Sequence, residues 1–261
     1  MSPEPVDPSA LIAVSSLAMC YPTGRMALTD TSLSLAAGEL VVILGANGCG
    51  KSTLLRCIAG MLQPTAGTVH VAGRQISGLT GSGLADARLA MGMVFQNAHL
   101  VKRRSVVANV MTGTLGRHRT LATAFGRLPK GEVPHAMACL DQVGLAAFAE
   151  QRASTLSGGQ AQRVSVARAL AQRPRALLAD EPVASLDPDA SEELMTLLRR
   201  VAHEDGIGVL CVLHQPELAR RYADRLLGMK DGAIQFEGKP AQVREQQVSA
   251  LYSKPQQKLA A

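Results

Sequence analysis

Short apolar runs, bounded by glycine, proline or polar residues, recur along most of this chain. The runs at 40–44, 91–95, 176–179 and 208–213 are apolar at almost every position, which is typical of strands buried on both faces of a parallel sheet. Segments with helical spacing lie between these runs, and in one of them the apolar side chains fall on a single stripe. The predicted helices span 52–59, 157–172 and 188–203. The alternation of strand and helix predicts an α/β fold built on a mostly parallel sheet.

Two hairpins are predicted outside this alternation. Residues 11–44 contain short strand-like runs, and two of them, 33–35 and 40–44, flank Ala-Ala-Gly-Glu as the strands of a hairpin do. Near the other end of the chain, Lys-Asp-Gly separates the apolar runs 225–229 and 233–237, which indicates a second hairpin.

Three stretches lack strand patterns altogether. From about 97 to 155 the composition becomes helical with glycine and proline breaks, which predicts a mainly helical insertion. The composition at 1–10 and at 241–261 predicts loose tails. We therefore expect a single folded domain over 11–240.

The composition narrows the function classes. Apolar residues make up 47% of the 261 residues, enough for a core, and we expect no membrane span because no 18 consecutive residues are apolar. Aromatic residues are only 3% and Trp is absent, which disfavours proteins that stack RNA or single-stranded DNA on aromatic rings. Five scattered cysteines, none in a CxxC pair, indicate reduced thiols rather than disulfides or a zinc site.

A glycine-rich segment, here called the phosphate loop, follows the run at 40–44. It fits the pattern GxxxxGK[ST] and stands between a predicted buried strand and a predicted helix. Glycines let such a loop aim its backbone N–H groups at phosphate oxygens, and the helix N-terminus adds partial positive charge. We expect Lys51 to reach the β- and γ-phosphates and Ser52 to ligate Mg²⁺. The phosphate loop comprises Gly45, Ala46, Asn47, Gly48, Cys49, Gly50, Lys51, Ser52 and Thr53.

Two carboxylates follow the buried run at 176–179. Asp180 and Glu181 stand at the carboxyl end of a predicted strand, where ligands of open α/β sheets bind. Taken alone, this pair is equally consistent with a surface turn. With a phosphate loop upstream, Asp180 is predicted to hold the Mg²⁺ shell and Glu181 to orient or deprotonate an attacking water.

A third pattern occupies residues 157–160, here called the signature segment. Ser157 and Gln160 have the spacing of a capping box, and Gly158 and Gly159 leave the start of the helix bare. A helix cap alone explains this spacing. A bare helix start also suits an anion. Since the phosphate loop already supplies one anion site, the second suggests a nucleotide held by a partner chain.

These motifs resemble those of ATP-binding cassette (ABC) ATPases, in identity and in order, over about residues 11–240. The resemblance implies a P-loop NTPase core with a mostly parallel sheet, an N-terminal antiparallel β subdomain and an inserted α-helical subdomain. Within that family, Leu-Ala-Asp-Glu-Pro-Val-Ala-Ser-Leu-Asp-Pro at 178–188 and Leu-His-Gln at 213–215 resemble the ATPase subunits of phosphonate importers. The family motifs are the phosphate loop, Gln96, Leu-Ser-Gly-Gly-Gln at 156–160, Asp180-Glu181, Ser185-Leu186-Asp187 and His214.

The resemblance also implies a role for single residues. It implies that Tyr21 stacks on adenine, that Gln96 senses Mg²⁺ and the attacking water, and that His214 contacts the γ-phosphate. Asp187 is implied to lie in a loop that crosses to the opposite subunit. Two subunits would sandwich two ATP molecules, so that each phosphate loop faces the signature segment of the partner chain.

The implied function is that of the ATP-hydrolysing subunit of an import system for phosphonate or a related phosphorus oxyanion. A homodimer of this chain would drive two transmembrane permease subunits from the cytoplasmic face of the inner membrane, as a peripheral protein, and a solute-binding protein would deliver the substrate. Two alternatives stay open, an importer ATPase for another small polar solute and a nucleic-acid-associated ABC ATPase. No nucleic acid is expected as a partner, because long heptad-bearing insertions and a second cassette are both missing.

Positive charge is concentrated in one part of the chain. Residues 87–131 contain eight Lys or Arg and no Asp or Glu, whereas the whole chain has a net charge of +6. A solvated basic face explains such a run on composition alone. The resemblance places it near the permease and the membrane surface, where anionic headgroups attract basic side chains.

Cys49 departs from the family, which often has Ser at this position. The thiol stands close to Lys51 and to a predicted helix N-terminus. Both favour a thiolate, so the sequence predicts a reactive cysteine in the phosphate loop.

Overall fold

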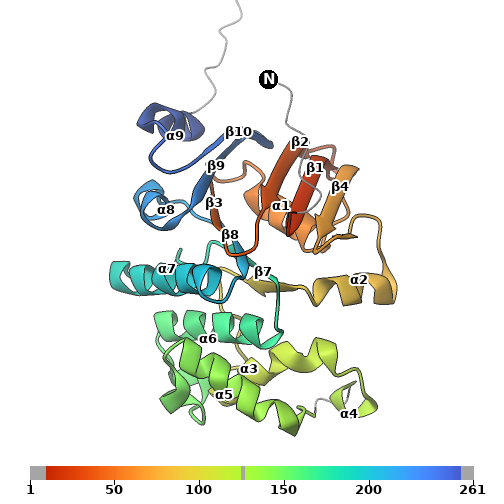
Figure 1. Cartoon of the computed structure of the whole chain (residues 1–261), viewed down its shortest axis with the longest axis vertical. Coiled ribbons are helices and arrows are strands. Elements are labelled where there is room, and N and C mark those ends of the chain that lie inside the picture. Colours follow the sequence, from red (N-terminus) through yellow and green to blue (C-terminus); the bar gives the residue numbers. More distant parts are fainter. Residues whose placement is uncertain (1–9, 125–126, 254–261) are drawn as a thin grey trace, which may run out of the picture.

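The computed structural model describes residues 10–124 and 127–253, which form two β-sheets with helices around them (Figure 1). The smaller sheet is antiparallel, with the strand order β2-β1-β4-β5. It is the antiparallel β subdomain that the family resemblance implies. Its strands are β1 (Ile12–Cys20), β2 (Met26–Leu35), β4 (Ala66–Val71) and β5 (Arg74–Gln75).

The larger sheet has the strand order β10-β9-β3-β8-β7-β6. All neighbouring pairs are parallel except β10 with β9, which form the predicted C-terminal hairpin. The apolar runs of the sequence are confirmed as strands of this sheet. Its strands are β3 (Leu40–Leu44), β6 (Met91–Val94), β7 (Ala176–Asp180), β8 (Gly208–Val212), β9 (Arg225–Lys230) and β10 (Ala233–Gly238).

Helix α1 (Lys51–Ile58) lies between the two sheets. Its Leu54 and Ile58 are fully buried in one core, which also contains Val41 of β3. The next residue of that strand, Val42, belongs to a second core on the other face of the sheet. Because side chains of a strand point alternately to opposite faces, a strand between two cores is apolar at every position.

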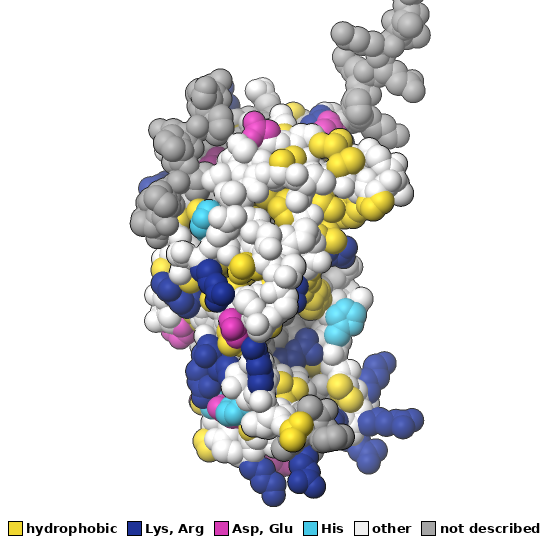
Figure 2. All heavy atoms as spheres, turned by 90° about the vertical axis from the view of Figure 1, so that its right-hand side faces the viewer, with side chains coloured by type: hydrophobic (Ala, Val, Ile, Leu, Met, Phe, Trp, Pro, Cys, Tyr) yellow, Lys and Arg dark blue, Asp and Glu magenta, His cyan; other side chains and the backbone are white. Residues whose placement is uncertain are grey.

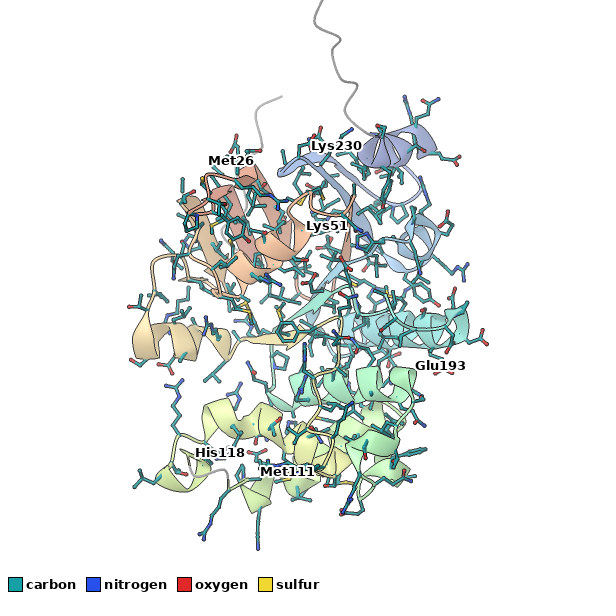
Figure 3. All side chains as sticks on the ribbon, turned by 180° about the vertical axis from the view of Figure 1, so that it is seen from behind. Met26, Lys51, Met111, His118, Glu193 and Lys230 are labelled. Atoms are coloured by element: carbon teal, nitrogen blue, oxygen red, sulfur yellow. The ribbon has the colours of Figure 1, made fainter. Side chains whose placement is uncertain are left out.

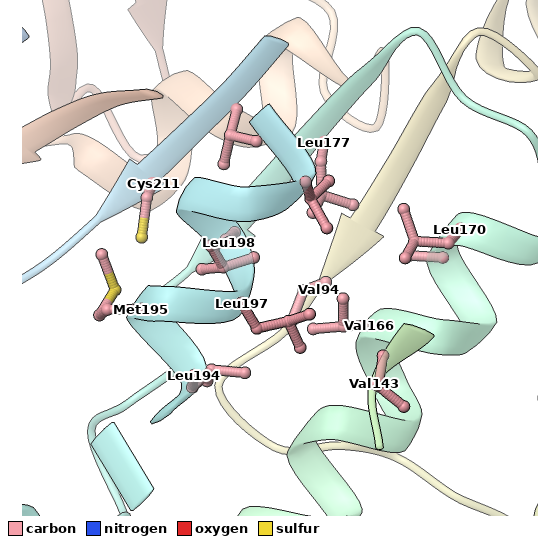
Figure 4. Close-up of a cluster of buried hydrophobic side chains, with 14 of the residues drawn as sticks. Val94, Val143, Val166, Leu170, Leu177, Leu194, Met195, Leu197, Leu198 and Cys211 are labelled. Carbon is pink, nitrogen blue, oxygen red and sulfur yellow. The ribbon is translucent and has the colours of Figure 1, made fainter. Parts of the chain in front are cut away.

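The second core lies between the larger sheet and a layer formed by α6 (Gly158–Ala171) and α7 (Pro188–His203). Figure 4 shows Val166 of α6 beside Leu197 of α7 and Val94 of β6 in this core. Helices α3 (Val106–Met111) and α5 (Val133–Gln142) pack against α6, so the segment from about 97 to 155 is helical as expected. The remaining helices are α2 (Gly81–Arg88), α4 (Leu121–Ala124), α8 (Pro216–Tyr222), α9 (Glu245–Tyr252) and short 3₁₀ turns at 112–117, 130–132, 146–148 and 153–155. Among the residues that the structure describes, none of the helices is both long and apolar enough to cross a membrane.

The predicted hairpin of 33–35 with 40–44 is wrong. Strand β2 pairs with β1 in the antiparallel sheet, whereas β3 pairs with β8 and β9 in the larger sheet. The turn between β2 and β3 therefore connects two sheets rather than two paired strands. The physical reason is burial, since β3 is buried at every position and a strand with a core on each face fits the middle of the parallel sheet.

The expected loose tail at 241–261 is wrong over its first part. Helix α9 packs beside β9, and its Val248 and Leu251 are buried. Few apolar positions mark this helix in the sequence, because it buries only two side chains against a surface that other elements form. The rest of that predicted tail, 254–261, and nearly all of the one at 1–10 lie outside the described residues.

Candidate active site

Three neighbouring parallel strands end at one edge of the larger sheet. Strands β3, β8 and β7 are adjacent in the sheet and point in the same direction. The phosphate loop follows β3, His214 follows β8, and Asp180 and Glu181 stand at the end of β7. Residues far apart in the sequence are thereby brought together where open α/β sheets bind their ligands.

Two glycines of the phosphate loop stand where no side chain fits. A Cβ atom on Gly45 would lie 2.3 Å from the carbonyl oxygen of Met229, so the loop rests directly on β9. Gly50 has a φ of 112°, and a Cβ atom there would lie 2.4 Å from the carbonyl oxygen of Ala27. Only glycine allows these close approaches, which hold the path of the loop near both of its ends.

Lys51 is a buried charge inside the phosphate loop, with 4% of its surface exposed. Figure 3 shows it between α1 and the C-terminal strands. Its Nζ donates hydrogen bonds to the carbonyl oxygens of Gly45 and Ala46, each at 2.9 Å. A buried ammonium group requires such acceptors. The backbone of the phosphate loop thus surrounds the Lys51 ammonium group. Its carbonyl dipoles compensate the positive charge only in part, and a bound phosphate would neutralise it.

A hydrogen bond joins the phosphate loop to β7. Ser52 Oγ donates to Asp180 Oδ1 at 2.9 Å. Burial raises the pKa of Asp180 above its usual value, and Glu181 raises it further, while the bond from Ser52 opposes both. The ionised Asp180 carboxylate would be stabilised by a cation, because desolvation penalises its charge.

The donor set fits Mg²⁺. The Ser52 hydroxyl and the Asp180 carboxylate supply the hard oxygen atoms that this ion prefers, and Mg²⁺ is commonly bound by one or two protein groups together with phosphate oxygens and water. Within 10–124 and 127–253, no cluster of three or more His, Cys, Asp or Glu is arranged to hold a metal ion.

Glu181 and His214 face each other across the ends of β7 and β8. His214 Nε2 lies 2.5 Å from Glu181 Oε1, and the two side chains are 30% and 21% exposed. Glu181 has a φ of 51°, in the left-handed region that non-glycine residues rarely adopt. Such a conformation persists where the surrounding structure holds it and is common at functional sites. The pair places a carboxylate and an imidazole beside the phosphate loop.

A cavity of about 430 Å³ opens between the phosphate loop and Glu181. Tyr21 lines it as well, and its hydroxyl lies 3.1 Å from Thr53 Oγ1. The residue expected to stack on adenine therefore stands beside the residues expected to bind phosphate. The lining residues are Tyr21, Arg25, Ala27, Asn47, Gly48, Gly50, Lys51, Ser52, Thr53 and Glu181.

Two of these lining residues, Arg25 and Ala27, were missed in the sequence. The Arg25 guanidinium donates to the carbonyl oxygen of Gly48 at 3.1 Å, so it adds a positive charge at the cavity. No motif marks either residue. Arg25 stands just before β2 and Ala27 lies in it, so both reach the phosphate loop only through the packing of the antiparallel sheet on α1.

Gln96 is not among the residues that line the cavity. Its side chain is exposed, and its segment is attached instead to α6. Gln162 Nε2 donates to the carbonyl oxygen of Phe95 at 2.7 Å. The Arg168 guanidinium donates to the second and third carbonyl oxygens after Gln96, at 2.8 and 2.9 Å. Gln96 is thus linked through its neighbours to the helix that begins at the signature segment.

The signature segment and Asp187 also lie apart from the residues that line the cavity. The predicted capping box is confirmed, since Ser157 Oγ accepts from the Gln160 N–H at 3.2 Å and Gln160 Oε1 accepts from the Ser157 N–H at 2.9 Å. Asp187 begins α7 in the same way, accepting from the Ala190 N–H at 2.8 Å. A Cβ atom on Gly159 would lie 3.0 Å from Ala190 Cβ. The two helix starts therefore form one largely exposed surface.

The predicted reactivity of Cys49 is not supported by its environment. The residue is 8% exposed, and its Sγ lies 3.9 Å from Lys51 Nζ. Burial raises the pKa of the Cys49 thiol, and the charge of Lys51 offsets only part of that rise. The expectation of a stabilised thiolate is wrong, because loss of hydration outweighs the neighbouring charge.

Comparison with known proteins places these features in a family. A family model described as ABC transporter matches residues 28–184, which include the phosphate loop, Gln96, the signature segment and the Asp180-Glu181 pair. This chain belongs to the ABC transporter family. It is one of the ATP-binding ATPase subunits of that family. Tyr21, Asp187 and His214 lie outside the matched span, so their assignment rests on their positions in the structure and on the family order of motifs.

Two curated relatives of this ABC ATPase extend over nearly its whole length. Phosphonates import ATP-binding protein PhnC 3 of Nostoc sp. is 47% identical over 243 residues, which cover 93% of this chain and 92% of the relative. Phosphite import ATP-binding protein PxtA of Stutzerimonas stutzeri is 45% identical over 253 residues, which cover 97% of this chain and 90% of the relative.

Solved ABC structures confirm the expected fold. The CbiO1 protein of Clostridium perfringens, described as part of the CbiONQ transporter complex, is 30% identical and has a TM-score of 0.79 over 89% of each chain. The dimeric bacterial ABC transporter cassette MJ0796 is 33% identical, with a TM-score of 0.76 over 88% of this chain and 98% of its own. MJ0796 has also been solved in a post-hydrolysis state with ADP and phosphate.

Proposed function

We propose that two copies of this ABC ATPase bind two ATP molecules with Mg²⁺, hydrolyse them, and thereby energise uptake of a phosphonate or phosphite through separate membrane subunits. The observation that carries the proposal is the convergence of three strand ends at the edge of the sheet where the cavity opens. Lys51 and Ser52 follow β3, Asp180 and Glu181 end β7, and His214 follows β8.

Each residue has a task that its geometry supports. The phosphate loop and Lys51 bind the β- and γ-phosphates, and Tyr21 stacks on adenine. Ser52 and Asp180 hold Mg²⁺, which neutralises charge on the phosphate oxygens when it is bound. Glu181 orients the attacking water and accepts its proton. His214, 2.5 Å from Glu181, aligns that carboxylate and contacts the γ-phosphate.

A second chain completes each site in this proposal. Ser157, Gly158, Gly159 and Gln160 form the start of α6, a place that favours an anion. The capping box uses the backbone N–H groups of Ser157 and Gln160, which leaves those of Gly158 and Gly159 for a ligand. They do not line the cavity of their own chain, so the anion they bind is the nucleotide of the partner. Asp187 lies on the same surface and crosses the interface with them. Gln96, whose neighbours are hydrogen-bonded to α6, senses Mg²⁺ and the attacking water and links the site to the helical subdomain.

The proposed substrate and partners follow from the named relatives and from charge. PhnC 3 and PxtA are named as import proteins for phosphonates and phosphite, and we assign the same oxyanion class to this chain. Figure 2 shows Lys and Arg side chains projecting from the lower part of the molecule, which the helices α3 to α5 form in Figure 1. Such a basic surface suits a protein that binds two permease subunits at the cytoplasmic side of the inner membrane. A solute-binding protein would deliver the substrate on the opposite side of that membrane. Nucleic acid is not a proposed partner.

The experiment that tests this function reconstitutes the chain with its permease subunits and binding protein in proteoliposomes. Uptake of labelled methylphosphonate and phosphite is measured together with ATP hydrolysis, and sulfate serves as the comparison solute. We expect the phosphorus oxyanions, and not sulfate, to stimulate hydrolysis and to accumulate inside. Stimulation by sulfate alone, or hydrolysis that no solute affects, would contradict the assigned substrate class.

A further inference from the structure

Helix α9 brings a tyrosine hydroxyl to the strand ends of the active site. Tyr252, the last residue of α9, donates a hydrogen bond from its hydroxyl to the backbone carbonyl oxygen of His214 at 3.4 Å. Burial raises the pKa of Tyr252, and the nearby backbone N–H of Gly45 partly opposes that rise. The phenol group therefore bonds to the histidine beside Glu181 and lies next to the first residue of the phosphate loop.

A hydroxyl suits this position because it donates and accepts at the same time. Gly45 follows β3 and His214 follows β8, and the two strands are neighbours in the sheet. The Leu213 N–H donates to the carbonyl oxygen of Ile43 at 3.1 Å. Tyr252 lies just beyond this hydrogen bond, at the point where β3 and β8 each lead into a loop of the site.

The place of the tyrosine is set by several attachments of α9. Leu251 is 2% exposed and belongs to the second core. Lys230, which Figure 3 labels beside α9, donates to the carbonyl oxygen of Ala250 at 2.7 Å. Arg220 of α8 donates to two carbonyl oxygens of the segment 239–244, at 3.1 and 2.9 Å. Helix α9 is thereby anchored to β9 and to the helix that begins just after His214.

We propose that Tyr252 is a positioning residue for ATP hydrolysis, whose hydroxyl holds the backbone of His214 in place relative to the phosphate loop. The inference rests on the proposed roles of His214 and Glu181. Hydrogen bonds weaken steeply with misalignment, so a small shift of the His214 backbone turns the imidazole away from Glu181. Tyr252 itself touches no nucleotide and acts through His214.

The test compares two tyrosines that each lose only a hydroxyl. In Tyr252→Phe we expect kcat to fall about two- to tenfold, the effect of one lost hydrogen bond, with the KM for ATP and the melting temperature unchanged. The matched control is Tyr222→Phe, because the Tyr222 hydroxyl lies 3.1 Å from Thr196 Oγ1 and bonds to Glu192 on α7. It should keep the kcat of the unaltered protein. A merely structural role of Tyr252 predicts instead a lower melting temperature at unchanged kcat.

A second pair of variants tests the route through His214. If Tyr252 acts only through that residue, Tyr252→Phe has no further effect on single-turnover hydrolysis in a His214→Ala background, since coupled residues are not additive. An unchanged kcat in Tyr252→Phe, or the same loss in both backgrounds, overturns the proposal. Failure of the proposed function is distinguishable, because the unaltered protein would then hydrolyse no ATP or Glu181→Gln would keep full turnover.

Discussion

The cavity at the strand ends and the surface of the signature segment are built in different ways. The cavity joins residues that are distant in the sequence, and its lysine is buried and hydrogen-bonded within the chain. The signature segment is capped by residues three positions apart, and its helix start is exposed. One half of the proposed site is thus prepared by the fold of a single chain, and the other half is a local helix start that gains its ligand only from a partner.

The difference has a physical cause. The buried Lys51 and the partly buried Asp180 must be compensated where they stand, so their geometry is determined before any ligand arrives. The free N–H groups at a helix start are satisfied by water and can exchange it for an anion. Substitutions on the two sides should therefore separate nucleotide binding from turnover.

The largest effect is expected on the cavity side, for Glu181→Gln. The change keeps the size of the side chain and removes the proton acceptor, so turnover should fall by about two orders of magnitude or more, while ATP binding persists and an ATP-bound dimer accumulates. Steady-state hydrolysis, nucleotide binding and size-exclusion chromatography measure these three properties. Glu193→Gln is the control, because Glu193 is 62% exposed on α7. Near-normal hydrolysis by Glu181→Gln would contradict the assigned role.

A smaller effect is expected on the signature side, for Gly158→Asp. A Cβ atom fits here, since its nearest neighbour, Leu186 Cδ2, would be 3.7 Å away, and an acid at a helix start favours the helix. The new carboxylate repels the phosphates of the partner's nucleotide, so turnover should fall about tenfold or more at unchanged ATP affinity of the monomer. Gly158→Asn, of equal size and neutral, should retain most activity. A weaker monomer affinity in Gly158→Asp would break the separation of the two halves.

The third prediction concerns Cys49 on the cavity side. Because burial raises the pKa of this thiol, its thiolate fraction at neutral pH is low, and alkylation should be about tenfold slower than at the partly exposed Cys20. The rate should continue to rise with pH above the ordinary thiol range, since the reactive thiolate keeps forming until the raised pKa is passed. Mass spectrometry of the labelled peptides distinguishes the two sites. Preferential labelling of Cys49 at neutral pH would show that Lys51 outweighs burial after all.

The smallest effect is expected away from both halves, at Lys102, Arg103 and Arg104. Replacing the three exposed residues by Gln should leave ATP affinity intact and weaken binding to anionic vesicles about threefold. This loss is smaller than the binding free energy of about 1 kcal/mol that a single basic residue contributes close to anionic headgroups. The difference should shrink at high salt. Arg199→Gln on α7 is the control. Salt-sensitive nucleic-acid binding lost in the same triple variant, without any vesicle binding, would favour the nucleic-acid alternative.

The parts of the site that could be predicted are those formed by residues close together in the sequence. The phosphate loop, the capping box of Ser157 with Gln160 and the carboxylates after β7 depend on chain-local geometry, and the structure has each where its pattern indicates. Arg25 and Tyr252 had no such pattern. They reach the site from the segment just before β2 and from α9, through contacts that no spacing in the sequence encodes.

The sequence by itself determined the apolar strands of the larger sheet, the phosphate loop and the capping box of Ser157, because periodicity, glycine positions and side-chain-to-backbone hydrogen bonds act within a few residues. Only the tertiary structure decided that β2 and β3 belong to different sheets, that α9 packs beside β9, and that burial raises the pKa of Cys49. Each of these depends on what surrounds a residue in space. Burial and strand pairing depend on the assembled cores. A local pattern indicates them only where a strand has a core on both faces and is therefore apolar at every position.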